Sequence, residues 1–347
     1  MNRDLMKYVC EPVTKAPLTL TDERCDDNGN ITQGWLVSPS GRRYEIVRGI
    51  PRFAKAGGLE TSVRSFGEQW NYFNFVDFKK TWLTQTVQNT FGSTEVFKDK
   101  LIVDAGGGSG AQTLWMIESG ARKVILLELS DTVDDVITKN LRGVPSIQYD
   151  VIQCSIDEPP LRDHCIDGIV ICHNVIHHTP SVEKTADELF RIVAPGGEFV
   201  FNCYPRPDKG MKNWIRFHVF NAGIRKIISK LPFRLRLWYA RSMGILRFVP
   251  VLGFFLERLH FCVRGIVPSE STLFRRIVRK YRATVVNTFD AMGSHKFQHH
   301  KSDEEIMAIV QRLQPNPAKV LNAKEYFSNR RPVQCALRIL YDGSPRS

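Results

Sequence analysis

One stretch of the chain combines residue types that could bind a charged small molecule. Residues 101–110 read Leu-Ile-Val-Asp-Ala-Gly-Gly-Gly-Ser-Gly, so an apolar run ends in Asp104 and is followed by four glycines, Gly106, Gly107, Gly108 and Gly110. Glycines let the backbone approach a ligand closely, because no Cβ stands in the way. A helix that begins after Gly110 would also point its first N–H groups at the ligand. The stretch therefore predicts a buried strand, a tight binding turn and a helix.

Other polar side chains follow apolar runs further along the chain. Glu128 ends the run Val124-Ile-Leu-Leu, and a carboxylate there can accept both hydrogen bonds of a ribose diol. His177 and His178 follow a later run, and a histidine can act as a general base because its pKa lies near neutrality. The alternative for the two histidines is that they cap the next helix and pack.

These residues need a scaffold that brings the ends of separate strands together. From Lys100 the pattern alternates strands with helices of roughly 10 to 13 residues, which favours a parallel sheet covered on both faces. Ligands of such sheets bind at the carboxyl ends of the strands. The predicted strands are 101–105, 123–129, 147–153, 166–174 and 197–204, and the predicted helices are 110–119, 131–141 and 181–193. A helix over 303–313 and strands over 320–326 and 333–340, the last antiparallel, would complete seven strands.

The glycine spacing and its context resemble the class I S-adenosylmethionine-dependent methyltransferases. The first motif is Val-Asp-Ala-Gly-Gly-Gly-Ser-Gly over residues 103–110, which differs from the dinucleotide pattern G-x-G-x-x-G. The Asp-Gly-Ile-Val start and the His-His-Thr end of residues 167–179 resemble the fourth motif. The alternative is an unrelated α/β protein with a plain strand-turn-helix. The resemblance implies a Rossmann-like α/β fold that binds S-adenosylmethionine through Asp104, Gly106, Gly107, Gly108, Gly110, Glu128, Leu129, Ser155, Ile156 and His173.

One position departs from that family. An acid commonly faces the adenine amino group where Ser155 stands here, and Asp157 would take this role if the alignment shifts by two residues. The Asn/Asp-Pro-Pro-Tyr string of amino-group methylases is absent, which favours an oxygen or carbon acceptor on a small or lipid-linked metabolite. Methyl transfer would then depend mainly on positioning and desolvation. A non-catalytic scaffold that keeps the fold is the alternative function.

The first 53 residues predict a small β-rich module. Their last part, from Gly41 to Arg52, resembles the closing hairpin of the zinc-ribbon-like domain that precedes many bacterial methyltransferases. That domain usually carries two C-x-x-C pairs, but Val13 follows Cys10 where the second cysteine would stand, and residues 36–40 hold none. Because tetrahedral zinc needs four ligands, we expect a degenerate, metal-free ribbon that docks on the main domain. The eight cysteines stand singly, and His295, His299 and His300 lack carboxylates at ligand spacing, so no metal is predicted.

The rest of the chain divides by composition. A Gly/Ala linker is predicted over 54–61, followed by an aromatic-rich helix over 62–75 and a second helix over 82–91. In the resembled group the aromatic-rich helix helps to cover the cofactor, and the alternative is that its aromatic side chains only pack in the core. We expect a methyltransferase core over 62–204 and 301–342, interrupted by a basic helical insertion over 205–300 that caps the acceptor site.

The basic insertion carries the excess charge of the chain. The net charge of the whole is +12, and residues 205–282 hold 18 Lys and Arg against 3 acids, a net +15. Its aromatics and the apolar run 248–256 favour a peripheral membrane surface or an anionic lipid-linked substrate. Nucleic-acid binding is disfavoured, since it needs no apolar run, and a merely solvated basic face is the third interpretation. Without an export signal or an apolar run of ~18 residues, we expect a cytoplasmic protein with peripheral membrane contact. The acceptor and the oligomeric state are not predicted.

Overall fold

The structure is a computed structural model that describes residues 1–53, 60–206, 210–215, 217–218, 222–265, 267, 272–313, 319–329 and 335–343. Internal contacts divide the chain into two compact units. The first unit comprises Met1–Val63, Phe75–Pro205 and Phe297–Ser347, and the second comprises Arg64–Asn74 and Arg206–Lys296. Most of the predicted linker over 54–61 lies outside the described residues. The four-part domain division drawn from the sequence stays a prediction.

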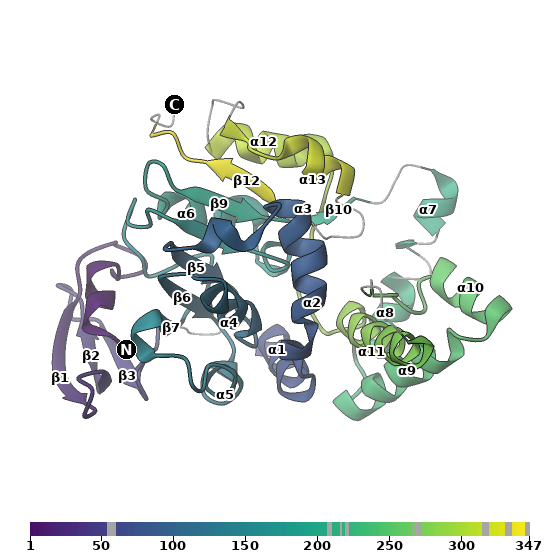
Figure 1. Ribbon diagram of the computed structural model, residues 1–347, viewed down its shortest axis with the longest axis horizontal. Helices are drawn as coiled ribbons and strands as arrows, with labels where there is room; N and C mark the ends of the chain where they lie inside the picture. The colour runs from purple at the N-terminus through teal and green to yellow at the C-terminus, as the bar shows by residue number, and fades with distance from the viewer. Residues whose placement is uncertain are drawn as a thin grey trace. The chain divides into compact units, whose positions relative to one another are not determined.

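The central sheet of the first unit has the strand order β12-β9-β8-β5-β6-β7 in the described part of the chain (Figure 1). Only β12 runs antiparallel to its neighbour, and the other pairs are parallel. The strands are β5 (Leu101–Ala105), β6 (Lys123–Glu128), β7 (Tyr149–Gln153), β8 (Ile169–Cys172), β9 (Glu198–Phe201) and β12 (Leu337–Leu340). The predicted mostly parallel, Rossmann-like sheet is confirmed.

Alternate residues of each strand pack on opposite faces of the sheet, as the period of two requires. Val103 and Leu127 contribute to the core beneath α6 (Val182–Arg191) and α12 (Asp303–Leu313). Ile102 and Val124 contribute to the other core, beneath α4 (Ala111–Glu118). Both faces are therefore covered by helices.

Shorter elements complete the first unit. They are α2 (Lys79–Thr81), α3 (Gln88–Thr90), α5 (Val136–Asn140), α13 (Ala323–Asn329), the π-helical η3 (Trp82–Val87), the 3₁₀ helices η1 (Arg3–Lys7), η2 (Phe75–Phe78), η4 (Thr94–Phe97), η5 (Asp131–Val133), η6 (Ser146–Gln148) and η7 (Ile176–His178), and the parallel pair β10 (Tyr204–Pro205) and β11 (His300–Lys301). The single helix predicted over 131–141 is thus split into η5 and α5.

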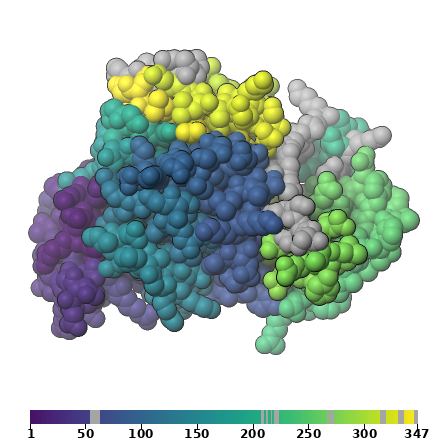
Figure 2. All heavy atoms as spheres, in the orientation of Figure 1, coloured from purple at the N-terminus to yellow at the C-terminus, as the bar shows by residue number. Residues whose placement is uncertain are grey.

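The strand predicted over 320–326 is wrong. Val320 makes one antiparallel bridge to Ile339, and then the chain turns into the helix α13. Asn322 ends the pairing: its side-chain oxygen accepts from the Arg338 N–H at 2.9 Å and its amide donates to the Ala336 carbonyl at 2.9 Å. Its amide also donates to the Thr90 carbonyl at 3.3 Å, so the C-terminal elements lie against α3, as the yellow and blue atoms of Figure 2 show. In the described residues the sheet therefore has six strands rather than seven.

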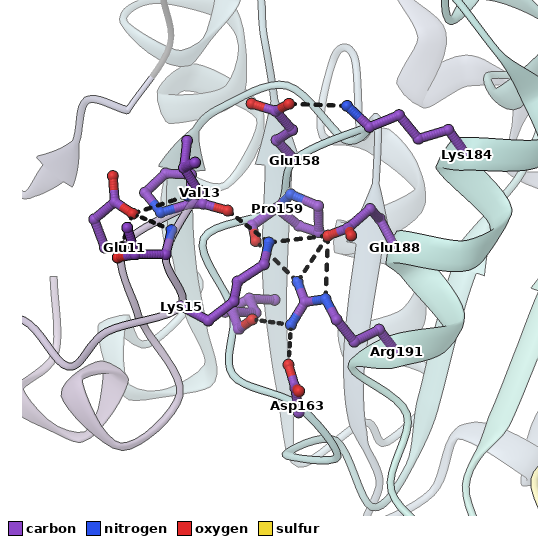
Figure 3. A network of polar contacts seen from close by, with 12 residues as sticks. Glu11, Val13, Lys15, Glu158, Pro159, Asp163, Lys184, Glu188 and Arg191 are labelled. Carbon is purple, nitrogen blue, oxygen red and sulfur yellow. Dashed lines mark hydrogen bonds and ion pairs between the residues drawn. The ribbon is translucent and has the colours of Figure 1, made fainter. Parts of the chain in front are cut away.

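The N-terminal module forms a separate antiparallel sheet that docks on the same core. Its strands are β1 (Thr19–Cys25), β2 (Ile31–Val37), β3 (Arg43–Val47) and β4 (Ile50–Pro51). Val9 bridges Leu161, and the Phe53 N–H donates to the Gln153 carbonyl at 2.8 Å. Lys15 reaches Glu188 of α6 at 3.0 Å, where Arg191 also binds that carboxylate (Figure 3). The resemblance to a zinc ribbon stays an interpretation of the sequence.

A buried carboxylate holds the loops of this module together. Glu11 is fully buried and accepts hydrogen bonds from the Tyr44 hydroxyl at 2.7 Å and from Arg42 at 3.0 Å. The backbone N–H groups of Val13 and Thr14 donate to its other oxygen. Burial alone would raise the pKa of Glu11, but the hydrogen bonds from Thr14, Tyr44 and Arg42 outweigh it and lower the pKa to about 2.

The second unit is helical in its described residues. It holds most of α1 (Glu60–Tyr72) together with α7 (Met211–Ile215), α8 (Ala222–Ile228), α9 (Phe233–Leu246), α10 (Pro250–Arg258) and α11 (Leu273–Ala291). Leu237, Ala240, Val285 and Phe289 form its core, and Phe73 packs edge-on against Phe289. The described helices of the whole chain include none that is long and apolar enough to cross a membrane.

Candidate cofactor site at the carboxyl ends of the strands

The glycine turn between β5 and α4 has a backbone that side chains would disturb. Gly106, Gly108 and Gly110 have φ angles of +85°, +57° and +75°, in the left-handed region that favours glycine. A Cβ on Gly107 would lie 2.6 Å from the side chain of Leu126. The glycines that the sequence singled out are therefore needed for the turn itself.

Glu128 locks this turn to the end of the neighbouring strand. The Gly108 N–H donates to one carboxylate oxygen at 2.7 Å, and the Ser130 N–H donates to the other at 2.8 Å. The Thr132 hydroxyl then donates to the Gly108 carbonyl at 2.9 Å. An ionised carboxylate has about four acceptor sites, so each oxygen keeps one for a further donor such as a ribose hydroxyl.

Asp104 supplies a second carboxylate at the end of β5. It is buried on the α4 side of the sheet, where the Thr113 hydroxyl donates to it at 2.6 Å. Burial, and to a smaller extent the nearby Glu128 charge, raises the pKa of Asp104 to about 6 despite the Thr113 hydrogen bond. A cationic group of a ligand would favour the ionised form.

The strand β7 leads to the position where an acid was expected. Ser155 is half-buried, and its hydroxyl donates to the carboxylate of Asp157. The two residues that the sequence offered as alternatives are therefore joined by a hydrogen bond, and which of them faces the adenine stays a prediction. Ile156 is buried and Leu129 is half-buried, so both add apolar surface to this part of the chain.

His173 follows β8 and is 7% exposed. Burial lowers its pKa to about 4, so the ring is neutral at neutral pH. Its Nε2 has no hydrogen-bond partner among the described residues, whereas Nδ1 lies 3.4 Å from the side-chain nitrogen of Asn174. A buried polar atom without a partner is rare in folded proteins, and here a ligand could supply the partner.

Asn202 is a residue of this edge that the sequence reasoning missed. Its side-chain oxygen accepts from the Asn174 N–H at 2.6 Å, and its amide donates to the Asn174 side-chain oxygen at 2.8 Å. This exchange holds Asn174 at a φ of +60°. The only sequence signal was its place directly after the strand β9.

The two candidate bases, His177 and His178, are held by packing. His177 is fully buried and stacks on Tyr204, with ring centroids 3.6 Å apart. Nδ1 of His178 lies 3.0 Å from the carbonyl oxygen of Phe297. These placements agree with the packing alternative, and a role as general base stays a prediction.

Arg52 of the N-terminal module also reaches this edge, which no motif indicated. Its guanidinium donates to Gln153 at 2.9 Å and pairs with Asp134 at 2.6 Å. Gln153 lies opposite Glu128 in the β6–β7 ladder, and its amide donates to the Leu129 carbonyl at 3.3 Å. The module therefore supports the loop that follows Glu128.

The donor set fits S-adenosylmethionine better than a metal. The narrow glycine turn, the unfilled acceptor sites of Glu128 and the unpartnered His173 Nε2 suit a nucleoside with an amino-acid tail. Over the described ranges, no group of three or more His, Cys, Asp or Glu side chains is placed to hold a metal ion. On α1, Phe66 stacks on His295 and Tyr72 lies edge-on to Phe233, both within the second unit, and the covering of the cofactor by this helix stays a prediction.

One comparison with known proteins concerns the segment that contains this site. Residues 103–201 match the family model described as a methyltransferase domain. This segment begins next to Asp104 and ends with β9, and the match indicates S-adenosylmethionine as the cofactor. The match covers the glycine turn and the strands from β5 to β9 within the first unit. No curated protein matches the chain significantly.

Several solved structures are similar to parts of the chain. A Listeria monocytogenes protein classed as an S-adenosylmethionine-dependent methyltransferase is 23% identical over 30% of this chain and 47% of its own, with a TM-score of 0.27. A chain of the Haloferax volcanii complex between the Trm112 methyltransferase activator and a methyltransferase is 21% identical over 40% of this chain and 61% of its own, with a TM-score of 0.33. A Mesorhizobium loti S-adenosylmethionine-dependent methyltransferase is 15% identical over 70% of this chain and 90% of its own, with a TM-score of 0.36. The chain thus spans about half of the first two structures.

Proposed function

We propose that this protein is an S-adenosylmethionine-dependent methyltransferase that acts on an oxygen or carbon atom of a small or lipid-linked metabolite. The observation that carries the proposal is the lock between Glu128 and the glycine turn, beside the buried Asp104. This arrangement brings two carboxylates and the glycine turn to one edge of a parallel sheet, where such folds bind ligands.

Each residue of this edge has a distinct role in the proposal. Asp104 would face the ammonium group of the methionine part, and Glu128 would accept from the ribose hydroxyls. Ile156 and the Ser155–Asp157 pair would contact the adenine, and the neutral His173 would lie beside the methionine part. When bound, S-adenosylmethionine supplies a methyl group on a sulfonium leaving group, and the chain contributes positioning and exclusion of water.

The type of acceptor rests on sequence arguments. The amino-group methylase string is absent, which favours oxygen or carbon, and the basic, apolar second unit favours an anionic or lipid-linked molecule. If the acceptor atom must lose a proton, His178 is the better placed of the two candidate bases, since His177 is fully buried.

Calorimetric titration of the full chain with S-adenosylmethionine and S-adenosylhomocysteine tests the proposal. We expect both to bind, Glu128→Ala to weaken binding by at least tenfold, and Gly108→Arg to abolish it because the arginine fills the turn. Asp167→Ala is the matched control, since Asp167 is exposed just before the amino end of β8, away from the strand ends.

Failure of the wild-type protein to bind either compound would overturn the proposal and favour a scaffold that keeps only the fold. Equal weakening by Asp167→Ala would overturn the assignment of the site. Where binding holds, incubation of lipid and quinone extracts with methyl-labelled cofactor would then identify the acceptor by the labelled product.

A further inference from the structure

Exposed apolar side chains are concentrated in the second unit. Among the described residues, all but three of the exposed large hydrophobic side chains belong to this unit, and the three exceptions are Val13, Ile147 and Leu321. Isolated apolar residues on a surface need no explanation, but a concentration of this kind marks a site of interaction.

The exposed residues follow helical spacing on three elements. On α9, Leu235, Trp238 and Ile245 stand at intervals of three and seven residues and therefore share one face. On α10, Val251 has Phe254 and Phe255 three and four residues after it, so these side chains also share one face, with exposures of 72%, 60% and 53%. The first turn of α11 adds Leu273, Phe274 and Ile277. These helices therefore expose ridges of aromatic and aliphatic side chains.

Basic residues accompany the apolar ridges. Arg275, Arg276 and Lys280 are exposed on α11 beside Phe274 and Ile277, and Arg234 and Arg241 are exposed on α9. The net charge of +15 over 205–282 contrasts with −3 for the rest of the chain. Exposed apolar and basic side chains on the same helices are complementary to the interface of an anionic lipid bilayer, whose headgroups attract Lys and Arg while its acyl boundary accepts Trp, Phe and Leu.

We propose that the second unit docks the protein on the surface of anionic membranes through this apolar and basic surface. Charge complementarity selects an anionic surface, and the apolar ridges distinguish a lipid interface from nucleic acid, which would be bound by arginine and stacked aromatics without exposed Leu, Ile and Val. The proposal goes beyond methyl transfer and does not depend on the cofactor site.

Co-sedimentation of the full chain with vesicles tests the docking proposal. Vesicles of phosphatidylglycerol and phosphatidylcholine are compared with vesicles of phosphatidylcholine alone, at low and at physiological salt. We expect binding to the anionic vesicles and at least about tenfold less to the neutral ones, with weaker binding as salt rises.

Two variants probe the two components of the surface separately. The double variant Phe254→Asp and Phe255→Asp removes apolar contact, and Arg275→Glu with Arg276→Glu reverses charge. Each should lower vesicle binding by about tenfold or more. Ile147→Asp is the matched control, because Ile147 is 60% exposed in the first unit.

Four outcomes would overturn the proposal. They are no binding to anionic vesicles at low salt, equal binding to neutral vesicles, equal loss in Ile147→Asp, or binding of a single-stranded RNA oligonucleotide without vesicle binding, which would assign the surface to nucleic acid. Because the two double variants lie in the second unit, calorimetry with S-adenosylmethionine on these proteins separates failure of membrane docking from failure of the cofactor site.

Discussion

At the scale of single residues, Asp104 is held in an environment that favours its neutral form. Its pKa of about 6 lies above the ordinary value of 3.8, so the folded state binds the proton more tightly than the unfolded state. Its contribution to stability is present below pH 4 and is lost as pH rises through 6. The loss amounts to about 3 kcal/mol. The ligand-free protein is therefore less stable at neutral pH because of this carboxylate.

Asp104→Asn should remove that pH dependence. Asparagine can still accept the Thr113 hydrogen bond but carries no charge to bury, so we expect a more stable ligand-free protein at pH 7 and cofactor binding weakened at least tenfold. Urea unfolding of both proteins between pH 4 and 7, with calorimetry, measures the two effects. A variant whose stability differs from that of the wild type by the same amount at every pH, or that binds S-adenosylmethionine normally, contradicts the role given to Asp104.

Glu11 has the opposite dependence on pH. Its pKa of about 2 lies below the ordinary 4.5, so its contribution is present above pH 4.5 and is lost as pH falls towards 2. At neutral pH, Glu11→Gln should lower the free energy of unfolding by about 3 kcal/mol, and the difference from wild type should shrink in acid. Urea midpoints from pH 3 to 7 measure this. Glu45 is an exposed carboxylate of the same module, so Glu45→Gln should leave the dependence of the urea midpoint on pH unchanged. Parallel pH dependences for Glu11→Gln and wild type would refute the role given to Glu11.

At the scale of elements, β4 and the residue after it connect the N-terminal module to the cofactor edge. Arg52→Ala would leave Asp134 and Gln153 without their shared donor, and the loop after Glu128 would lose that support. This prediction rests on the proposed function: we expect S-adenosylmethionine to bind the variant about 5- to 30-fold more weakly. A hydrogen bond to a charged group is worth ~1.5–3 kcal/mol, and water recovers part of that free energy. Arg43→Ala, which removes an exposed pair with Asp22 on the same module, is the control. Unchanged affinity of Arg52→Ala for S-adenosylmethionine would show that the loop after Glu128 keeps its conformation without Arg52.

The sequence predicted most elements of the core because their local signals agree. Residues 101–105 and 303–313 form the expected strand and helix, and Ser302 and Glu305 cap that helix reciprocally at 3.2 and 2.6 Å. The strand over 320–326 failed because one side chain, Asn322, ends the pairing after a single bridge, and the following Ala-Lys-Glu favours a helix. Such side-chain interruptions depend on tertiary partners that the apolar pattern does not contain.

The candidate site could likewise be predicted where its signals are local in the sequence. Glycine spacing located the turn, and strand ends located Asp104 and Glu128, because both signals are local in the chain. Arg52 and Asn202 lie 101 and 28 residues from their partners Gln153 and Asn174, and no local pattern joins such pairs. Contacts made only by the folded chain therefore account for what sequence reasoning missed.

At the scale of the whole molecule, the two units should respond separately to the cofactor. A ligand that binds the folded state protects the segments that it contacts from opening. We expect hydrogen exchange with S-adenosylmethionine present to slow at 104–110 and 128–133, and to stay unchanged in α9 and α10. Uniform slowing throughout the second unit, or none in the glycine turn, would contradict this expectation. The Glu128→Ala variant, treated identically, should show no change on addition of the cofactor.

The lock between Glu128 and the glycine turn has a consequence for the thermodynamics of recognition. The turn is already ordered in the ligand-free chain, because its N–H groups are fixed by hydrogen bonds to Glu128 and Leu127. Conformational entropy that was lost when the chain folded is not lost a second time when a nucleoside arrives. Most of the interaction enthalpy therefore remains available as affinity, and the protein meets its cofactor with a preorganised cradle rather than by folding around it.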